Sequence, residues 1–260
     1  MRFRDRVVLI TGGGSGIGRA AALAFGREGA SVMVMDIDLR GAEMTAREIG
    51  LSGGRALFFS GDVGVKKDAD AVVGNTVSRL GGLHVLFNNA GLELVALLTE
   101  TSEESWDRVH DTNMKGTFLM CRAALPHMKD AGFGVVINNA SDAGLRGIKL
   151  SAAYSSSKAG VIHLTRSIAL DYAKFGIRAN CVCPGCIRTP LCERFNEEVG
   201  ARKGMSGEAV LQEFVDANIP MKRVGTPEEV ASVVLFLSSD DAIYVNGAVI
   251  PVDGGLTAGM

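Results

Sequence analysis

Tyr154 and Lys158 are the two residues of this sequence best suited to proton transfer. They lie four residues apart near the start of a helical stretch that runs to about Phe175, so both side chains lie on one helix face. A lysine ammonium beside a phenol favours the phenolate and lowers the phenol pKa from about 10 toward neutrality. Such a tyrosine can exchange a proton with an alcohol or a carbonyl. The same spacing is common in surface pairs, so other residues must support the assignment.

A glycine-rich turn near the N-terminus is suited to binding a pyrophosphate. The segment TGGGSGIG lies between an apolar strand-like run and a helix of small residues, and it contains Gly12, Ser15, Gly16, Ile17 and Gly18. Glycines let backbone N–H groups approach phosphate oxygens, and the helix N-terminus adds partial positive charge. The spacing G-x-x-x-G-x-G differs from G-x-G-x-x-G, but its placement after the first strand predicts a dinucleotide site.

Asp36 ends the second expected strand, eighteen residues after Gly18. A carboxylate there accepts hydrogen bonds from the adenosine ribose hydroxyls and repels a 2′-phosphate. Neither Ser15 nor Ile37 supplies a cation that would offset this repulsion. The sequence therefore predicts NAD rather than NADP as the cofactor. The alternative is that Asp36 only ends a strand in a turn.

These residues are positioned by alternating strands and helices. Apolar strand-like segments occupy residues 7–10, 31–35, 56–59, 85–87, 135–138, 178–182 and 248–252, and helical spacing lies between them, as at residues 18–28, 39–49 and 66–80. Continuously apolar strands are typical of a parallel sheet that is covered on both faces. We expect an α/β fold: a Rossmann-like doubly wound parallel sheet of about seven strands, with helices on both faces and the ligand crevice at the carboxyl ends of the strands.

The chain is expected to form one domain over residues 1–260, because no linker or internal repeat divides it. Residues 189–221 break the alternation and are more polar and less regular. A long insertion in a compact domain is usually functional, so we expect a mobile substrate flap there.

Composition narrows the class of protein. Hydrophobic residues make up 47% of the chain and charged residues 22%, which is typical of a globular core. The net charge of -2 argues against nucleic acid as a partner. No apolar run approaches the roughly 20 residues that a membrane helix needs. The N-terminus lacks the apolar region of a signal peptide, so a cytoplasmic location is expected.

Four of the five cysteines lie close together, at Cys181, Cys183, Cys186 and Cys192. The segment CPGC at residues 183–186 has the spacing of a metal or redox pair, but no second Cys or His pair lies at ligand spacing. We expect reduced thiols that fill a strand and a loop, and no metal site.

The order of motifs resembles that of the short-chain dehydrogenase/reductase family over essentially the whole chain. The thirteen residues from Ser141 to Tyr154 are part of a family-like spacing that makes the resemblance specific. The matching features are residues 11–18, Asp62-Val63, Asn88-Asn89-Ala90-Gly91, Asn113, Ser141, the Tyr154/Lys158 pair, Pro184-Gly185 with Thr189, and Val252-Asp253-Gly254-Gly255.

The resemblance implies a catalytic set of Asn113, Ser141, Tyr154 and Lys158. Ser141 would hydrogen-bond the substrate oxygen, and Tyr154 would be the general acid/base. Lys158 would lower the tyrosine pKa and hold the nicotinamide ribose, while Asn113 would anchor a water that connects the lysine to solvent. Such a set combines a proton relay with electrostatics organised around a hydride donor.

The resemblance also implies cofactor contacts and an assembly. Residues 252–255 resemble a segment near a subunit interface, which implies a homotetramer. The implied contacts are Asp62 and Val63 for the adenine, Asn89 and Gly91 for the turn that supports the adenosine ribose, and Ile187 and Thr189 for the nicotinamide carboxamide, with Pro184 in the same segment.

Three residues near the expected site depart from the family pattern or have no assigned role. Glu93 and Asp142 could bind a polyhydroxylated or cationic substrate, but solvated loop carboxylates are the expectation. Cys186 is placed by the resemblance near the nicotinamide and the substrate, so bulky thiol reagents should slow turnover and NAD should protect.

Together these features imply an NAD-dependent oxidoreductase that interconverts a secondary alcohol and its ketone. Leu145, Leu150 and Leu191 predict an apolar side to the pocket, which favours a cyclic alcohol or diol as the small-molecule substrate. The alternatives are a 3-ketoacyl thioester reductase, NAD-assisted epimerisation or dehydration, and a non-catalytic NAD-binding protein. The intact catalytic set favours an enzyme over the last of these.

Overall fold

Strands that are buried on both faces form the centre of the molecule. The computed structural model describes residues 1–259, and in it all strands run parallel in the order β3-β2-β1-β4-β5-β6-β7. Because the order reverses between β1 and β4, the loops that leave their carboxyl ends turn toward opposite faces of the sheet and leave a crevice. The strands are β1 (Val7–Thr11), β2 (Ser31–Asp36), β3 (Arg55–Ser60), β4 (Val85–Asn88), β5 (Gly134–Asn139), β6 (Ile177–Pro184) and β7 (Val249–Val252).

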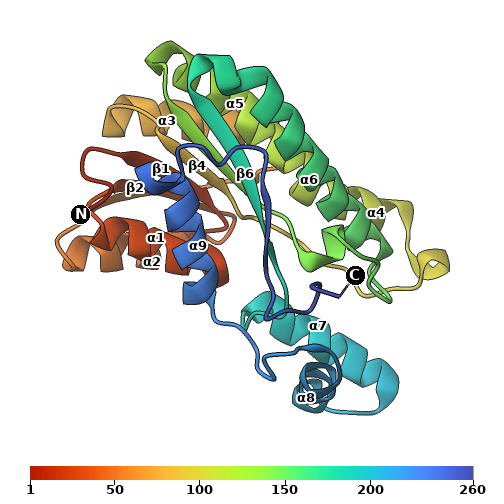
Figure 1. Cartoon of the computed structure of the whole chain (residues 1–260). Helices are drawn as coiled ribbons and strands as arrows, with labels where there is room; N and C mark the ends of the chain where they lie inside the picture. The colour runs from red at the N-terminus through yellow and green to blue at the C-terminus, as the bar shows by residue number, and fades with distance from the viewer. Residues whose placement is uncertain (260) are drawn as a thin grey trace.

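Helices cover both faces of this sheet (Figure 1). One face packs against α1, α2 and α9, and the other against α3, α5 and α6. Among residues 1–259, no helix is long and apolar enough to cross a membrane. The helices are α1 (Gly16–Arg27), α2 (Leu39–Leu51), α3 (Lys66–Leu80), α4 (Glu103–His110), α5 (Gly116–Ala131), α6 (Ala152–Tyr172), α7 (Pro190–Lys203), α8 (Gly207–Asn218) and α9 (Pro227–Ser238).

The two sides of the sheet form two separate apolar cores. Side chains alternate across a strand, so Val8 and Ile10 of β1 pack toward α1 and α9, whereas Val7 and Leu9 pack toward α3 and α5. All four side chains are buried, and each contributes about 1.5–3 kcal/mol through removal of apolar surface from water. Both cores together hold the strand ends, and the loops on them, in fixed positions.

The predicted α/β fold is confirmed, and all seven predicted strand segments are strands. Most observed strands extend one or two residues beyond the apolar run, because backbone pairing continues where polar residues begin. In β2, for example, pairing with β3 continues through Asp36, which lies opposite Ser60. The apolar pattern marks the buried side chains of a strand, whereas the backbone hydrogen bonds to the neighbouring strand continue beyond that segment.

Residues 189–221 form two regular helices, so the expectation of an irregular segment is wrong. Thr189 caps α7 by accepting a hydrogen bond from the Cys192 N–H at 3.3 Å, and Ser206 caps α8 through the Ala209 N–H at 3.2 Å. Only a narrow apolar stripe that includes Leu211 packs inward, which explains the polar composition. The two helices pack together beyond the end of β6 (Figure 1).

Candidate active site

A cavity of about 1020 Å³ lies at the carboxyl ends of the strands. It is formed by the loops after β1, β3 and β4, the ends of β2 and β5, one side of α6 and the start of α7. This is the crevice that the strand order produces between β1 and β4. The predicted site residues that line it are Gly12, Ser15, Gly16, Ile17, Asp36, Asp62, Val63, Asn89, Gly91, Tyr154, Lys158 and Thr189.

Three predicted cofactor residues lie outside this lining. Gly18 packs against the glycine loop itself, and a Cβ there would lie 2.1 Å from the Gly12 carbonyl oxygen. Pro184 is the buried last residue of β6. Ile187 is buried, pairs with Gly225 and lines a second cavity of about 320 Å³. None of these three residues therefore lines the larger cavity.

The glycine loop has the geometry of an anion cradle. Gly12 and Gly16 have φ values of 62° and 51°, which side chains with a Cβ rarely adopt. A Cβ at Gly12 would lie 2.9 Å from Ala90 Cα. Within residues 1–259, the Ser15 side chain makes no capping hydrogen bond to α1. The first N–H groups of α1 are thus free to bind an anion such as pyrophosphate.

Backbone hydrogen bonds fix the Asp36 carboxylate at the edge of the cavity. Its Oδ2 accepts from the Gly14 N–H at 2.8 Å, and its Oδ1 accepts from the Asp38 N–H at 2.9 Å. Asp38 lines the same part of the cavity. Two carboxylates beside the glycine loop fit ribose hydroxyls, which donate hydrogen bonds, and the cavity as a whole fits a dinucleotide.

Tyr154 and Lys158 lie in the first turns of α6 and are buried, with 8% and 3% of their surfaces exposed. The Lys158 Nζ lies 5.6 Å from the centroid of the Tyr154 ring. The same nitrogen donates a hydrogen bond to the carbonyl oxygen of Asn139 at 2.7 Å. Sequence reasoning missed Asn139, although its place at the end of β5 indicates a crevice residue.

Burial determines the protonation of both residues. It raises the pKa of Tyr154 above its ordinary value, and the nearby Glu93 raises it further, whereas hydrogen bonding with Ser141 acts the other way. Burial lowers the pKa of Lys158 to about 8. In the protein alone the pKa of Tyr154 is therefore raised, because loss of solvation is the largest influence on it. That Lys158 lowers this pKa stays a prediction.

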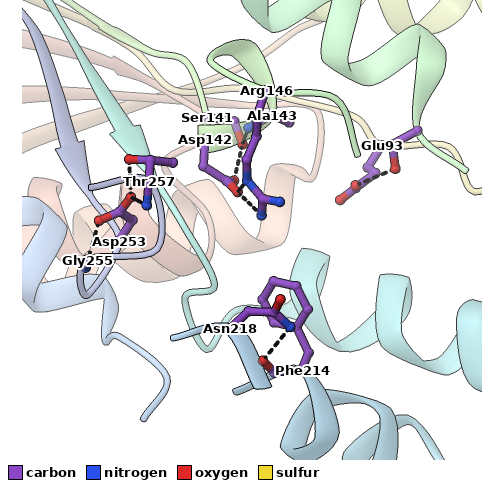
Figure 2. A network of polar contacts seen from close by, with 11 residues as sticks. Glu93, Ser141, Asp142, Ala143, Arg146, Phe214, Asn218, Asp253, Gly255 and Thr257 are labelled. Atoms are coloured by element: carbon purple, nitrogen blue, oxygen red, sulfur yellow. Dashed lines mark hydrogen bonds and ion pairs between the residues drawn. The ribbon is translucent and has the colours of Figure 1, made fainter. Parts of the chain in front are cut away.

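Ser141 belongs to a small buried network with Asp142 and Arg146 (Figure 2). The Ser141 Oγ accepts from the Ala143 N–H and donates to the Asp142 Oδ1, both at 3.1 Å. The Asp142 Oδ2 accepts from Arg146 Nε at 3.1 Å and Nη2 at 2.8 Å. Asp142 is 8% exposed, so the expectation of a solvated carboxylate is wrong. Its spacing of four residues from Arg146 was the available signal.

Asn113 ties the loop after β4 to α6. It lies in a π-helical turn, Asp111–Lys115, between α4 and α5, and such turns are frequent at functional sites. Its Oδ1 accepts from the Leu92 N–H at 2.8 Å, and its Nδ2 donates at 2.9 Å to the Leu92 carbonyl and to Ser157 Oγ. The side chain is 1% exposed, so it holds the two walls of the site together.

Glu93 follows this loop and is partly shielded from solvent. Its Oε1 accepts a hydrogen bond from Ser151 Oγ at 3.4 Å, and burial raises its pKa to about 7. Glu93 is thus partly shielded, and less solvated than the sequence led us to expect. The reason is long-range, since a bridge between Ala96 and Ser151 holds the loop against the start of α6.

All five cysteines, each within the part of the chain that the structure describes, are free thiols. Cys181 and Cys183 are buried in β6, as the apolar strand pattern predicts. The Cys186 and Cys192 Sγ atoms lie 3.5 Å apart. Cys186 lines the smaller cavity of about 320 Å³ rather than the larger one, and its place near the nicotinamide and the substrate stays a prediction.

Comparisons with known proteins agree with this fold. Residues 12–257 match the family model described as enoyl-(acyl carrier protein) reductase, a short-chain dehydrogenase/reductase model. The chain is 43% identical to an uncharacterized oxidoreductase of Thermotoga maritima, with 99% of this chain and 100% of the relative covered. It is 42% identical to a cyclohexanol dehydrogenase of Acinetobacter sp., with 99% and 97% covered.

A solved relative has nearly the same architecture. The crystal structure of levodione reductase superposes with a TM-score of 0.94 at 40% identity, with 100% of both chains covered. The chain therefore belongs to the short-chain dehydrogenase/reductase family. It is an oxidoreductase of CH–OH groups in a family whose dehydrogenases use nicotinamide cofactors.

Proposed function

We propose that this protein is an NAD-dependent dehydrogenase/reductase that interconverts a secondary alcohol, preferably a cyclic alcohol or diol, with its ketone. The observation that carries the proposal is one cavity lined by Tyr154, Lys158 and the glycine loop, with Asp36 at its edge. A non-catalytic binding protein has no need for a buried tyrosine and lysine, whose burial costs stability.

In this proposal, Tyr154 is the general acid/base. Its raised pKa keeps the phenol protonated near neutral pH, so it can donate a proton to a ketone oxygen. In the direction of alcohol oxidation, the phenol must first release its own proton, and the resulting phenolate then takes the proton from the alcohol oxygen. Ser141 holds the same oxygen by a hydrogen bond. Bound nicotinamide supplies or accepts the hydride. Lys158 places positive charge beside the phenol, and Asn113 fixes the loop that faces it.

The cofactor residues that we propose are those of the cavity wall. The glycine loop and the N-terminus of α1 would hold the pyrophosphate. Asp62 and Val63 would hold the adenine, and Asn89 with Gly91 would support the adenosine ribose. Thr189 would hold the carboxamide, with Ile187 and Pro184 shaping that wall.

NAD is favoured over NADP in this proposal because Asp36 and Asp38 lie together at the cavity edge. Both would repel a 2′-phosphate, and the Asp36 carboxylate is held in place by two backbone N–H groups. We further propose that α7 and α8 are the substrate flap and that four copies assemble into a homotetramer.

The substrate class rests on relatives and on the apolar Leu191 at the cavity wall. Levodione reductase of Leifsonia aquatica is 40% identical, and meso-2,3-butanediol dehydrogenase of Serratia marcescens is 37% identical. A second candidate is reduction of 3-ketoacyl thioesters, because a 3-oxoacyl-[acyl-carrier-protein] reductase of Thermotoga maritima is 38% identical.

The proposal is tested by incubating the protein with NAD or NADP and a panel of cyclic alcohols, diols, hydroxysteroids and 3-hydroxyacyl thioesters. Absorbance of the reduced nicotinamide is followed. We expect faster oxidation of cyclic alcohols or diols, with NAD as the better cofactor. A preference for thioesters would support the second candidate, and tight NAD binding without turnover on any substrate would contradict catalysis.

A further inference from the structure

Glu93 has a carboxylate oxygen that the catalytic arrangement above does not use. The residue lies in the loop that leaves β4 through the cavity-lining residues 89–92. Its Oε1 accepts from Ser151 Oγ at 3.4 Å. Among the residues that the structure describes, Oε2 has no hydrogen-bond donor and Glu93 has no ion-pair partner. Oε2 is not among the buried unpaired atoms of the described chain, so a ligand can reach it. A ligand hydroxyl that donates to this oxygen can replace the water that otherwise solvates it.

The groups around Glu93 place it between the reacting tyrosine and the flap. Its charge acts on Tyr154 and on Cys192 of α7, while Asp142, Lys158 and Glu198 act on Glu93 itself. Figure 2 shows the Asp142–Arg146 pair above Phe214 and Asn218 of α8, with Glu93 set apart from the pair toward the right of the view. Glu93 is therefore close to the point where a substrate oxygen would meet Tyr154.

Neighbouring cations are engaged elsewhere. Arg146 pairs with Asp142 at 2.8 Å, and Lys158 donates to the Asn139 carbonyl at 2.7 Å. A neutral hydroxyl group can satisfy Glu93 without an added charge. Because a pKa of about 7 allows both forms near neutrality, the side chain can accept from a hydroxyl or donate to a carbonyl.

We propose that Glu93 is a specificity-determining residue that hydrogen-bonds a second hydroxyl group of the substrate, so that the enzyme prefers a diol to the corresponding monoalcohol. This inference rests on the proposed function and deepens it. A site that hydrogen-bonds a substrate hydroxyl discriminates strongly against the analogue that lacks it, because its polar group is then left unpaired.

The test compares cis-1,2-cyclohexanediol with cyclohexanol for the wild type, Glu93→Leu and Glu93→Gln. Glu43→Gln makes the same chemical change at an exposed position of α2 and is the matched control. We expect Glu93→Leu to lower kcat/KM for the diol by about ten- to a hundredfold, mainly through KM. Cyclohexanol should be oxidised as fast as before or faster. For Glu93→Gln, which is nearly isosteric, kcat/KM for the diol should lie between the values of the wild type and of Glu93→Leu. Glu43→Gln should have the kcat/KM of the wild type.

Equal losses on both alcohols in Glu93→Gln would overturn the inference, because Glu93 would then act through Tyr154 or the loop. Unchanged kinetics on the diol, or a wild type that oxidises only cyclohexanol, would overturn it as well. In each of these cases the proposed function survives. A folded wild type that binds NAD but oxidises neither these alcohols nor the wider panel would overturn the proposed function, and the inference with it.

Discussion

Lys158 on α6 is tied to the end of β5 by the hydrogen bond from its Nζ to the Asn139 carbonyl oxygen, over 2.7 Å. The contact fixes a positive charge at the boundary between the sheet and the helix that carries Tyr154. It also holds the ammonium in a site where only 3% of the residue is exposed. The cost of this placement appears as the lowered pKa of Lys158, about 8.

Replacing Lys158 by Met is expected to remove activity and raise stability. The folded-state pKa is about 8 against an ordinary 10.5, so between these values the unfolded chain binds more protons. The free energy of unfolding therefore rises with pH across that window and is reduced at pH 7. We expect kcat to fall at least about a hundredfold and Tm at pH 7 to rise by about 2–4 °C.

Thermal unfolding at pH 7 and pH 10 checks the stability part. The difference in Tm between Lys158→Met and the wild type should be smaller at pH 10, where the wild-type lysine is neutral. A lower Tm for the variant at pH 7 would contradict the account, because it would make the hydrogen bond to Asn139 stronger than the cost of burial.

Asp36→Ala is expected to weaken the preference for NAD. The variant loses a fixed acceptor for the ribose hydroxyls and a charge that repels a 2′-phosphate. The ratio of kcat/KM for NAD to that for NADP should fall by about ten- to a hundredfold. Asp130→Ala, at an exposed position of α5, is the control and should keep the ratio. An unchanged ratio in Asp36→Ala would show that cofactor choice lies elsewhere.

Gly18→Ala is expected to disrupt the glycine loop, whereas Gly50→Ala should not. At Gly18 the added Cβ would lie 2.1 Å from the Gly12 carbonyl oxygen, and at Gly50 of α2 it would meet no atom of the described chain within 4 Å. We expect Gly18→Ala to lose about 1–3 kcal/mol or more of unfolding free energy, and Gly50→Ala to match or exceed the wild type. Denaturant unfolding measures both, and equal stability would contradict the close packing.

Iodoacetamide is expected to modify Cys192 before Cys186 and to slow turnover. The Cys186 thiol can donate to the Cys192 sulfur across 3.5 Å, which lowers the pKa of Cys192 and raises that of Cys186. The thiolate is the reactive form, and Cys192 lies in the first turn of α7, beside the cavity. Peptide mass spectrometry against residual activity checks this. Complete alkylation of Cys192 with full activity would contradict it, and Cys192→Ser should resist inactivation.

The sequence was sufficient for the fold because buried parallel strands are continuously apolar, and each predicted strand overlaps an observed one to within one or two residues at either end. Most of the candidate site could also be proposed from the sequence, since Tyr154, Lys158 and the glycine loop belong to motifs with fixed local geometry. Glu93 is more shielded than expected because its environment depends on a distant contact, the bridge of Ala96 to Ser151. Asp142 was misjudged although its partner Arg146 lies only four residues away.

Two further differences have related causes. The pKa of Tyr154 is raised mainly by burial. Burial depends on how the whole domain folds, and it cannot be predicted from the four-residue spacing between Tyr154 and Lys158. The helices α7 and α8 bury only a narrow stripe, so their apolar period is weak, although Thr189 and Ser206 are the caps that mark their starts.

The most direct test of the central claim is the steady-state rate of NAD reduction by the wild type and by Tyr154→Phe with the best alcohol of the panel. The phenylalanine keeps the ring and removes only the proton-carrying oxygen. We predict a fall in kcat of at least about a hundredfold, with the Kd for NAD, measured by calorimetry, within about twofold of the wild type. A variant that retains most of its kcat would contradict the assignment of Tyr154 as the general acid/base.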